Sequence, residues 1–310
     1  MQASVPERTD MATGILLTLL IGVLWSFVGV YYKFIARWNL SVFNISLVAN
    51  VFSIVVLAAL QLRGLAGKPV ALEPPPLLYA LFIIVAGALN SGGSLMLQRS
   101  MLYGRSGITW AIGQSAMIVP FVALALFFGE RWIPVKVAGT VLVLAGMGIL
   151  GAGRNDGEAP RPGYGLLLAL EAFLVLGVAQ SMTASTSYLS YRDELELRPV
   201  LLAIGGLIGA LAGKVLLRDR GFRMERRALA VVILMSLQGL LVLLVQFKAL
   251  DLLGAHGLGG IFFPVAIGTC IAGYSVWSIV LFKEKATLPV IAGTAVILVG
   301  ILMYCLVGGL

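Results

Sequence analysis

Two stretches of this chain, 154 residues apart, have nearly the same sequence. Seven residues recur in the same order without a gap: Phe128, Glu130, Ala138, Gly139, Thr140, Leu144 and Gly146 match Phe282, Glu284, Ala292, Gly293, Thr294, Leu298 and Gly300. Each copy ends an apolar segment, crosses a charged turn and enters another apolar segment. An internal repeat decides which folds are available to a chain. Duplicated hydrophobic hairpins are typical of secondary transporters, which place a substrate site between two related halves.

The composition indicates that this chain belongs in a lipid bilayer. Hydrophobic residues make up 60% of its 310 residues and charged residues 12%, whereas a soluble domain has about 45–50% and about 25%. The Lys and Arg residues lie mostly at the ends of apolar runs, so the net charge of +8 is explained by membrane anchoring rather than by a nucleic-acid partner. We expect a multi-pass protein of the cell membrane, with a bacterial inner membrane as the expected location.

Ten segments are apolar and long enough to cross the hydrocarbon core, which takes about 20 helical residues. The first five are expected near Ala12–Phe34, Leu40–Leu62, Pro76–Gln98, Gly107–Phe128 and Pro134–Gly151. The second five are expected near Tyr164–Ser190, Pro199–Leu217, Ala228–Leu250, Gly257–Phe282 and Leu288–Val307. A polar N-terminal segment, 1–11, lacks the features of a removed signal peptide. The Gly- and Pro-rich stretch 153–163 connects the two halves, 12–152 and 164–308.

The odd number of helices in each half sets how the halves are related. Two copies of a five-helix unit in tandem must begin on opposite sides of the membrane. The predicted fold class is therefore an all-α polytopic membrane protein, with ten transmembrane helices arranged as two inverted five-helix repeats.

The repeated motif resembles the EamA-type repeat of the drug/metabolite transporter superfamily. In both, a helix ends in Phe-x-Glu, a short turn follows, and the next helix carries Ala-Gly-Thr and a Gly six residues on. The resemblance covers the whole chain and implies a ten-helix inverted-repeat transporter that works by alternating access around a central cavity. The two copies differ in the position of a proline, Pro134 against Pro289. The stretch around Gly254–Gly260 also makes the second half about six residues longer before the motif.

Glu130 and Glu284 lie in the two charged turns. Acidic residues in such turns are ordinarily hydrated or paired with the adjacent base, here Arg131 and Lys285. Their recurrence in both halves favours a structural part in the turn, such as capping the following helix. Direct contact with substrate is the alternative.

Small residues follow each turn at a spacing of seven, which places them on one face of a helix: Gly139 and Gly146 in the first half, Gly293 and Gly300 in the second. Small residues on one face let membrane helices approach closely. We expect the last helix of each half to pack on the other through these glycines. Dimerisation through the same face is the alternative.

Glu171 is the only carboxylate inside the ten expected segments. An ionisable group at membrane depth is costly and is by default a candidate functional residue. Glu171 could bind a cationic group of the solute or carry a coupling proton. The alternative is that it lies near enough to the interface to be hydrated. The small multidrug-resistance relatives of the superfamily use a Glu in their first helix, whereas Leu20 occupies the corresponding place in the first half here.

Other polar and aromatic residues of the apolar segments form stripes at helical spacing. A lone polar residue in a membrane helix more often joins two helices than contacts a ligand, but stripes on five helices favour a shared hydrated cavity. Tyr32, Thr183 and Gln246 belong to these stripes. The candidate substrate-binding residues, together with Glu171, are Trp25, Asn90, Ser94, Gln98, Trp110, Gln114, Gln180, Gln238, Tyr274 and Trp277.

These features predict a secondary transporter of a small metabolite, and the resemblance implies export. No nucleotide-binding motif of the G-x-x-x-x-G-K-[ST] type occurs. No Lys or Arg lies in the middle of a segment to bind a phosphate, so an amino-acid-like or amphipathic solute is expected. The main alternative is a flippase for a lipid or a lipid-linked precursor, with the basic loop Lys214–Arg227 on the headgroup. A membrane-embedded enzyme is disfavoured because no loop carries a catalytic cluster.

The expected partners are the solute, membrane lipids and protons, with no nucleic acid, and the oligomeric state is open. His256 is the only histidine and cannot form a histidine-cluster metal site, so no metal or cofactor is expected. Two indications of how the chain is oriented in the membrane disagree. With the N-terminus inside, the cytoplasmic segments hold eight Lys and Arg and the outer loops fourteen, six of them in Lys214–Arg227. This favours an outside N-terminus, whereas the resemblance implies an inside one.

Overall fold

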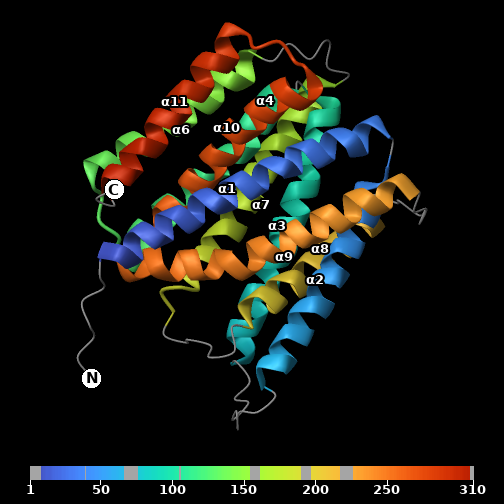
Figure 1. Ribbon diagram of the computed structural model, residues 1–310, viewed down its shortest axis with the longest axis vertical. Helices are drawn as coiled ribbons and strands as arrows, with labels where there is room; N and C mark the ends of the chain where they lie inside the picture. The colour runs from blue at the N-terminus through green and yellow to red at the C-terminus, as the bar shows by residue number, and fades with distance from the viewer. Residues whose placement is uncertain are drawn as a thin grey trace.

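The computed structural model describes residues 8–38, 40–65, 76–104, 106–153, 161–189, 197–216 and 226–307. Every regular element in these ranges is a helix (Figure 1): α1 Arg8–Arg37, α2 Val42–Leu65, α3 Leu77–Tyr103, α4 Ser106–Gln114, η1 Ser115–Met117, α5 Ile118–Phe128, α6 Pro134–Gly153, α7 Pro162–Ser185, α8 Arg198–Leu216, α9 Arg226–Ala255, η2 Gly259–Ile261, α10 Phe262–Phe282 and α11 Leu288–Val307. The prediction of an all-helical chain is confirmed. Most of the N-terminal segment, the connecting stretch and the basic loop, namely 1–7, 154–160 and 217–225, lies outside the described residues.

Ten spans in the described part of the chain are long and apolar enough to cross a membrane, as predicted. Two of them contain a short 3₁₀ turn: α4, η1 and α5 share one span, and η2 leads into α10 in another. Pro120 and Pro264 explain both turns. Proline has no N–H for the carbonyl four residues earlier, and those carbonyls belong to Ala116 in η1 and Gly260 in η2. A tighter turn at that point accommodates the lost hydrogen bond.

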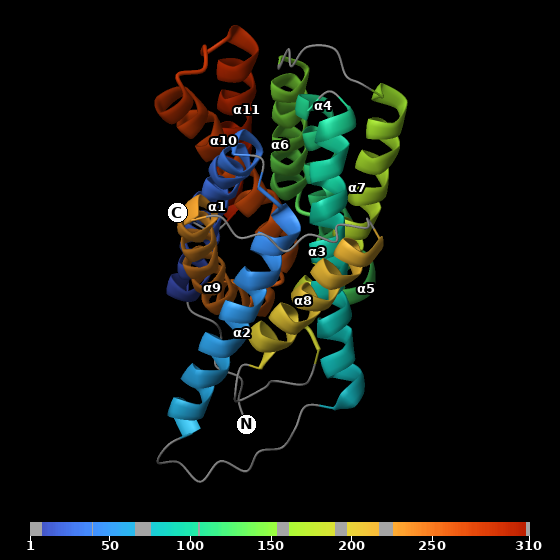
Figure 2. The ribbon, with the colours of Figure 1, turned by 90° about the vertical axis from the view of Figure 1, so that its right-hand side faces the viewer.

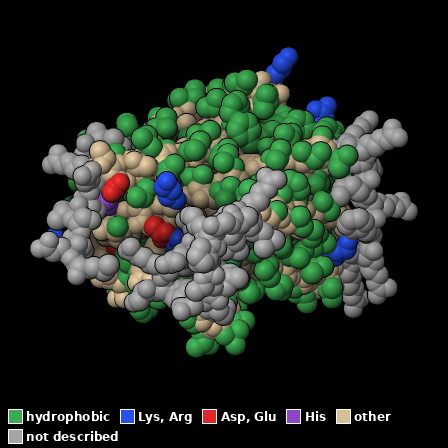
Figure 3. Space-filling model, turned by 60° about the horizontal axis from the view of Figure 1, so that its bottom comes forward, with side chains coloured by type: hydrophobic (Ala, Val, Ile, Leu, Met, Phe, Trp, Pro, Cys, Tyr) green, Lys and Arg blue, Asp and Glu red, His purple; other side chains and the backbone are tan. Residues whose placement is uncertain are grey.

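The outside of the bundle is apolar, as a bilayer requires. Large hydrophobic side chains are exposed along it, including Leu78 at 81%, Phe127 at 79% and Leu288 at 79%. Figure 3 shows hydrophobic side chains over most of one face, with the acidic side chains in view gathered toward one end. A soluble monomer would not expose so large an apolar surface, whereas lipid chains cover it without cost.

The glycine motif joins α6 to α11 (Figure 1). A Cβ on Gly146 would lie 2.6 Å from the carbonyl oxygen of Gly293, and one on Gly300 would lie 2.8 Å from that of Gly139. The first glycine of each helix thus faces the second glycine of the other, so the two helices run antiparallel. A hydrogen bond of 2.5 Å between the hydroxyls of Thr140 and Tyr304 fixes the register. The predicted packing of the last helices of the two halves is confirmed.

The remaining helices surround the centre of the bundle (Figure 2). α1 packs on α9 and α10, α3 packs on α7 and α8, and α2 lies against α8 and α9. Glycines bring several of these pairs together: a Cβ on Gly205 would lie 2.0 Å from the carbonyl oxygen of Ile84, which allows α8 to cross α3 at backbone contact. The centre is therefore bounded by helices from both ends of the sequence.

Candidate solute-binding cavity

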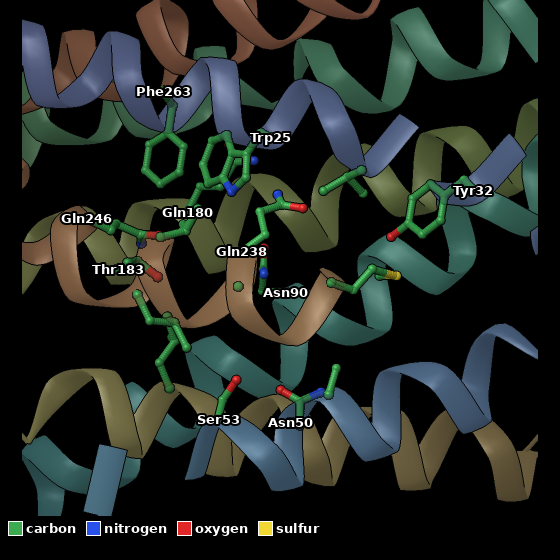
Figure 4. A pocket seen from close by; sticks show the side chains of 17 residues that line it. Trp25, Tyr32, Asn50, Ser53, Asn90, Gln180, Thr183, Gln238, Gln246 and Phe263 are labelled. Carbon is green, nitrogen blue, oxygen red and sulfur yellow. The ribbon is translucent and has the colours of Figure 1, made fainter. Parts of the chain in front are cut away.

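A cavity of about 270 Å³ lies between the central helices (Figure 4). At about 30 Å³ per water molecule, it has room for about nine waters or one small metabolite. Its polar and aromatic lining comes from both halves: Trp25 and Tyr32 of α1, Asn50 and Ser53 of α2, Asn90 of α3, Gln180 and Thr183 of α7, Gln238 and Gln246 of α9, and Phe263 of α10. None of the described residues that line it is Asp, Glu, Lys, Arg or His.

Four of the eleven candidate residues line this cavity: Trp25, Asn90, Gln180 and Gln238. Tyr32, Thr183 and Gln246, which belong to the same sequence stripes, line it as well. Asn90 is exposed although it lies midway along α3, because it faces the hollow. The structure thus brings three of the predicted amides and one aromatic residue together, and their contact with a solute stays a prediction.

Asn50 and Ser53 of α2 also line the cavity, although sequence reasoning did not single them out. The side-chain nitrogen Nδ2 of Asn50 donates to the backbone carbonyl of Ser46 at 2.8 Å, and Ser53 is 4% exposed. A signal for them exists, since two polar residues three apart in an otherwise apolar segment share one helix face.

Six other candidates do not line the cavity. Ser94, Gln98 and Gln114 are absent from its walls, although Gln98 interacts by a hydrogen bond with the side chain of Tyr32. Trp110 packs instead on a buried apolar cluster of α3, η1 and α7. Two aromatic candidates hold α10 to α1, because the ring of Tyr274 lies against Gly29 and the indole N–H of Trp277 donates to Ser26 at 2.8 Å.

Glu171 does not lie in the cavity either. It is exposed on α7, in a stripe of exposed apolar residues formed by Leu167, Leu170, Leu174 and Val178. These residues are spaced at three and four, so they form the outer face of the helix. Glu171 thus lies apart from the cavity that four other candidates line, and its part in binding or coupling stays a prediction.

A second polar cluster, termed the Glu130 cluster, lies at the turn between α5 and α6. The Glu130 carboxylate is 5% exposed and accepts hydrogen bonds from Lys136 Nζ at 2.8 Å, from the backbone N–H of Gly260 at 2.9 Å and from the hydroxyl of Tyr188. Lys136 is 1% exposed. The expectation that Glu130 is either hydrated or paired with Arg131 is wrong, because Glu130 is buried and its partners come from α6, from the turn after α7 and from η2.

Tyr188 stays protonated in this cluster. Burial, and then the negative charge of Glu130, raise the pKa of its hydroxyl well above the usual range. The phenol therefore donates to Glu130 at any physiological pH, while its oxygen accepts the backbone N–H of Gly259 at 3.0 Å. The Glu130 cluster thus joins the first half of the chain to two turns of the second half.

Glu284, the repeat counterpart of Glu130, also makes an ion pair across the fold. Its partner in this pair is Lys33 near the end of α1, whereas the adjacent base Lys285 was expected. The side chains of Lys33 and Glu284 are 33% and 39% exposed. The Lys33 ammonium also lies 4.1 Å from the ring centre of Phe282. Each glutamate of the duplicated motif therefore binds the end of the first helix of the other half.

The two glutamate contacts flank the cavity. Tyr188 lies five positions after the lining residue Thr183, and Gly260 lies three positions before the lining residue Phe263. Lys33 comes directly after the lining residue Tyr32, and Figure 4 shows Tyr32 at the opposite side of the cavity from Thr183 and Phe263. The Glu130 cluster thus lies toward one end of the cavity region, and the Lys33–Glu284 pair lies toward the other.

The described residues contain no group of three His, Cys, Asp or Glu side chains that could hold a metal ion. Comparison of the sequence with protein-family models and with curated proteins finds no match. Comparison with solved structures finds the same fold: one crystal structure superposes with a TM-score of 0.72, covering 97% of this chain and 98% of the other. The two sequences are 15% identical, so this likeness concerns the fold alone.

Proposed function

We propose that this protein is a secondary transporter, which carries a small solute across the membrane through the central cavity by alternating access. The observation that carries the proposal is a cavity of about 270 Å³ whose described lining residues are uncharged and include five amides, in the midst of ten helices long and apolar enough to span a membrane. Polar groups at this depth are costly unless they bind something or one another. Solutes in secondary transporters bind at the corresponding place, between the repeats.

The halves of the proposed transporter are inverted repeats of the drug/metabolite transporter kind. Two observations support this arrangement. α6 and α11, which carry the duplicated motif, run antiparallel through matching glycines. Contacts also recur when the halves are exchanged: α1 packs on α9 and α10, while α7 packs on α3, α4 and α5. Such reciprocal contacts are expected when a two-fold axis relates the halves.

In this mechanism, the two glutamate contacts break and form in alternation. The Glu130 cluster joins the halves at one end through three hydrogen bonds to a buried carboxylate. The Lys33–Glu284 pair joins them at the other end through a partly exposed ion pair. Breaking one contact while the other holds opens the cavity toward one side only.

Flux measurements in proteoliposomes test the proposal. We expect the wild-type protein to transport at least one member of a panel of neutral and amphipathic metabolites, measured with and without a proton gradient. Ser53→Phe fills the cavity and is expected to reduce that flux at least about tenfold, as a misplaced group at a binding site does. Glu171→Gln is the matched control, and because Glu171 faces away from the cavity, flux and proton dependence are expected within about twofold of wild type.

Two results would count against this account. Loss of proton dependence in Glu171→Gln would place coupling on the outer face of α7. Absence of flux for every solute, together with scrambling of labelled lipid by the same proteoliposomes, would replace the solute transporter with a flippase.

A further inference from the structure

The walls of the cavity contain hydrogen-bond acceptors whose partners are missing. The oxygens Oε1 of Gln180 and Gln238 are buried and have no hydrogen-bond partner among the described residues. Each side chain is 8% exposed and belongs to the cavity wall. Buried polar atoms in folded proteins nearly always have a partner, and an acceptor left without one destabilises the protein. A ligand that donates to both oxygens removes that cost.

Two amides of the cavity use one N–H each within the protein. Gln238 Nε2 donates to the backbone carbonyl of Leu24 at 2.7 Å, and Asn50 Nδ2 donates to that of Ser46 at 2.8 Å. These bonds fix which end of each amide is nitrogen. With its nitrogen so assigned, Oε1 of Gln238 is a buried acceptor without a partner among the described residues, as Oε1 of Gln180 is. These two oxygens are the groups that a donor from the solute would satisfy.

We infer that the transported solute presents N–H groups to Gln180 and Gln238 and carries no carboxylate or phosphate, an inference that rests on the proposed transport function. An anion would be buried beside carbonyl oxygens, with no Lys, Arg or His among the described lining residues to neutralise it. Burial of an unpaired charge is strongly unfavourable. Trp25, Tyr32 and Phe263 supply aromatic surface for an apolar body (Figure 4). The amino-acid-like solute expected from the sequence thus narrows to a neutral amide without a free carboxylate.

Two compounds of the same shape but different polar groups test this inference. 4-Methylpentanamide and 4-methylpentanoate have the same carbon skeleton, but only the amide has N–H donors and only the carboxylate is charged. Isothermal titration into the purified full-length protein in detergent measures both dissociation constants. We expect the amide to bind at least about tenfold more tightly, which corresponds to one or two hydrogen bonds together with the avoided burial of an ion.

Substitution of the acceptors provides the second measurement. Gln180→Leu removes a buried oxygen that has no partner, so folding is expected to be preserved, and amide binding is expected to weaken about three- to tenfold. Gln114→Leu is the matched control, because Gln114 lies outside the cavity walls, and it should leave the dissociation constant unchanged. Equal binding of the two compounds by the wild-type protein, or unchanged amide binding in Gln180→Leu, would overturn the inference.

The binding experiment and the flux experiment test different claims, so either claim can be contradicted while the other stands. If the protein transports anionic metabolites and does not bind the amide, transport stands and the inferred solute class is wrong. If it binds the amide through Gln180 but moves no solute in proteoliposomes, the recognition chemistry stands and the transport function is wrong.

Discussion

Replacement of Glu130 with glutamine is expected to destabilise the protein by about 3–5 kcal/mol, the usual cost of removing one partner of a buried ion pair. The variant keeps the shape of the side chain but removes its charge. Lys136, 1% exposed, would then be a buried ammonium without its counter-charge, and Tyr188 and the N–H of Gly260 would each lose an ionised acceptor. Denaturant unfolding of the purified protein in detergent measures the loss.

Two variants make this expectation specific. Glu284→Gln alters the repeat counterpart, whose ion pair is partly exposed, and such pairs contribute at most about 1 kcal/mol. The double variant Glu130→Gln/Lys136→Met removes both charges and should recover most of the stability lost in the single variant. Equal destabilisation by Glu130→Gln and Glu284→Gln would show that burial of the Glu130 cluster has no energetic consequence.

Gly146→Leu is expected to have the second large effect, because α6 and α11 touch at backbone distance. Even a Cβ at this position would lie 2.6 Å from the carbonyl oxygen of Gly293, so a leucine forces the two helices apart. Overpacking of this kind ordinarily costs about 1–3 kcal/mol, and occasionally more. We expect a loss at the upper end of that range, because the obstructing atom is backbone and cannot rotate away. The unfolding free energy and the yield of folded protein measure it.

Gly148 provides the control on the same helix. No atom of a neighbouring element lies within 4 Å of a Cβ built there, so Gly148→Leu should change the unfolding free energy by less than about 1 kcal/mol. It also exchanges a poor helix former for a good one. Similar losses in Gly146→Leu and Gly148→Leu would indicate a general intolerance of α6 to bulk rather than a close contact with α11.

The features that depend on local sequence could be predicted. A run of apolar residues identifies a span by length alone, and a glycine repeat at a spacing of seven marks one helix face. The duplicated copies predicted that the glycine faces of α6 and α11 pack on each other, because each helix needs a partner with the same small face. Stripes of amides likewise predicted Gln180 and Gln238 in one cavity.

The features that depend on packing between distant segments could not be predicted. Glu130 has a base next to it in sequence, but it pairs across the fold with Tyr188, 58 positions away, and with the N–H of Gly260, 130 positions away. Glu171 illustrates the second limit: it was singled out as the one carboxylate of the expected segments, and only the structure shows that it lies on the outer face of α7. Tyr274 and Trp277 follow the same rule, since an aromatic face can serve a neighbouring helix as well as a solute.

In the proposed mechanism, the cavity opens to opposite sides of the membrane when one or the other glutamate contact is broken. Labelling of a cavity cysteine with a membrane-impermeant maleimide tests it without knowledge of the solute. Ser53→Cys supplies the target, in a chain whose two free cysteines, Cys270 and Cys305, are replaced by serine. Labelling rates are compared in right-side-out and inside-out vesicles. We expect Glu130→Gln to raise labelling in one kind of vesicle and Glu284→Gln to raise it in the other; an increase from the same side in both variants would contradict alternating access through this cavity.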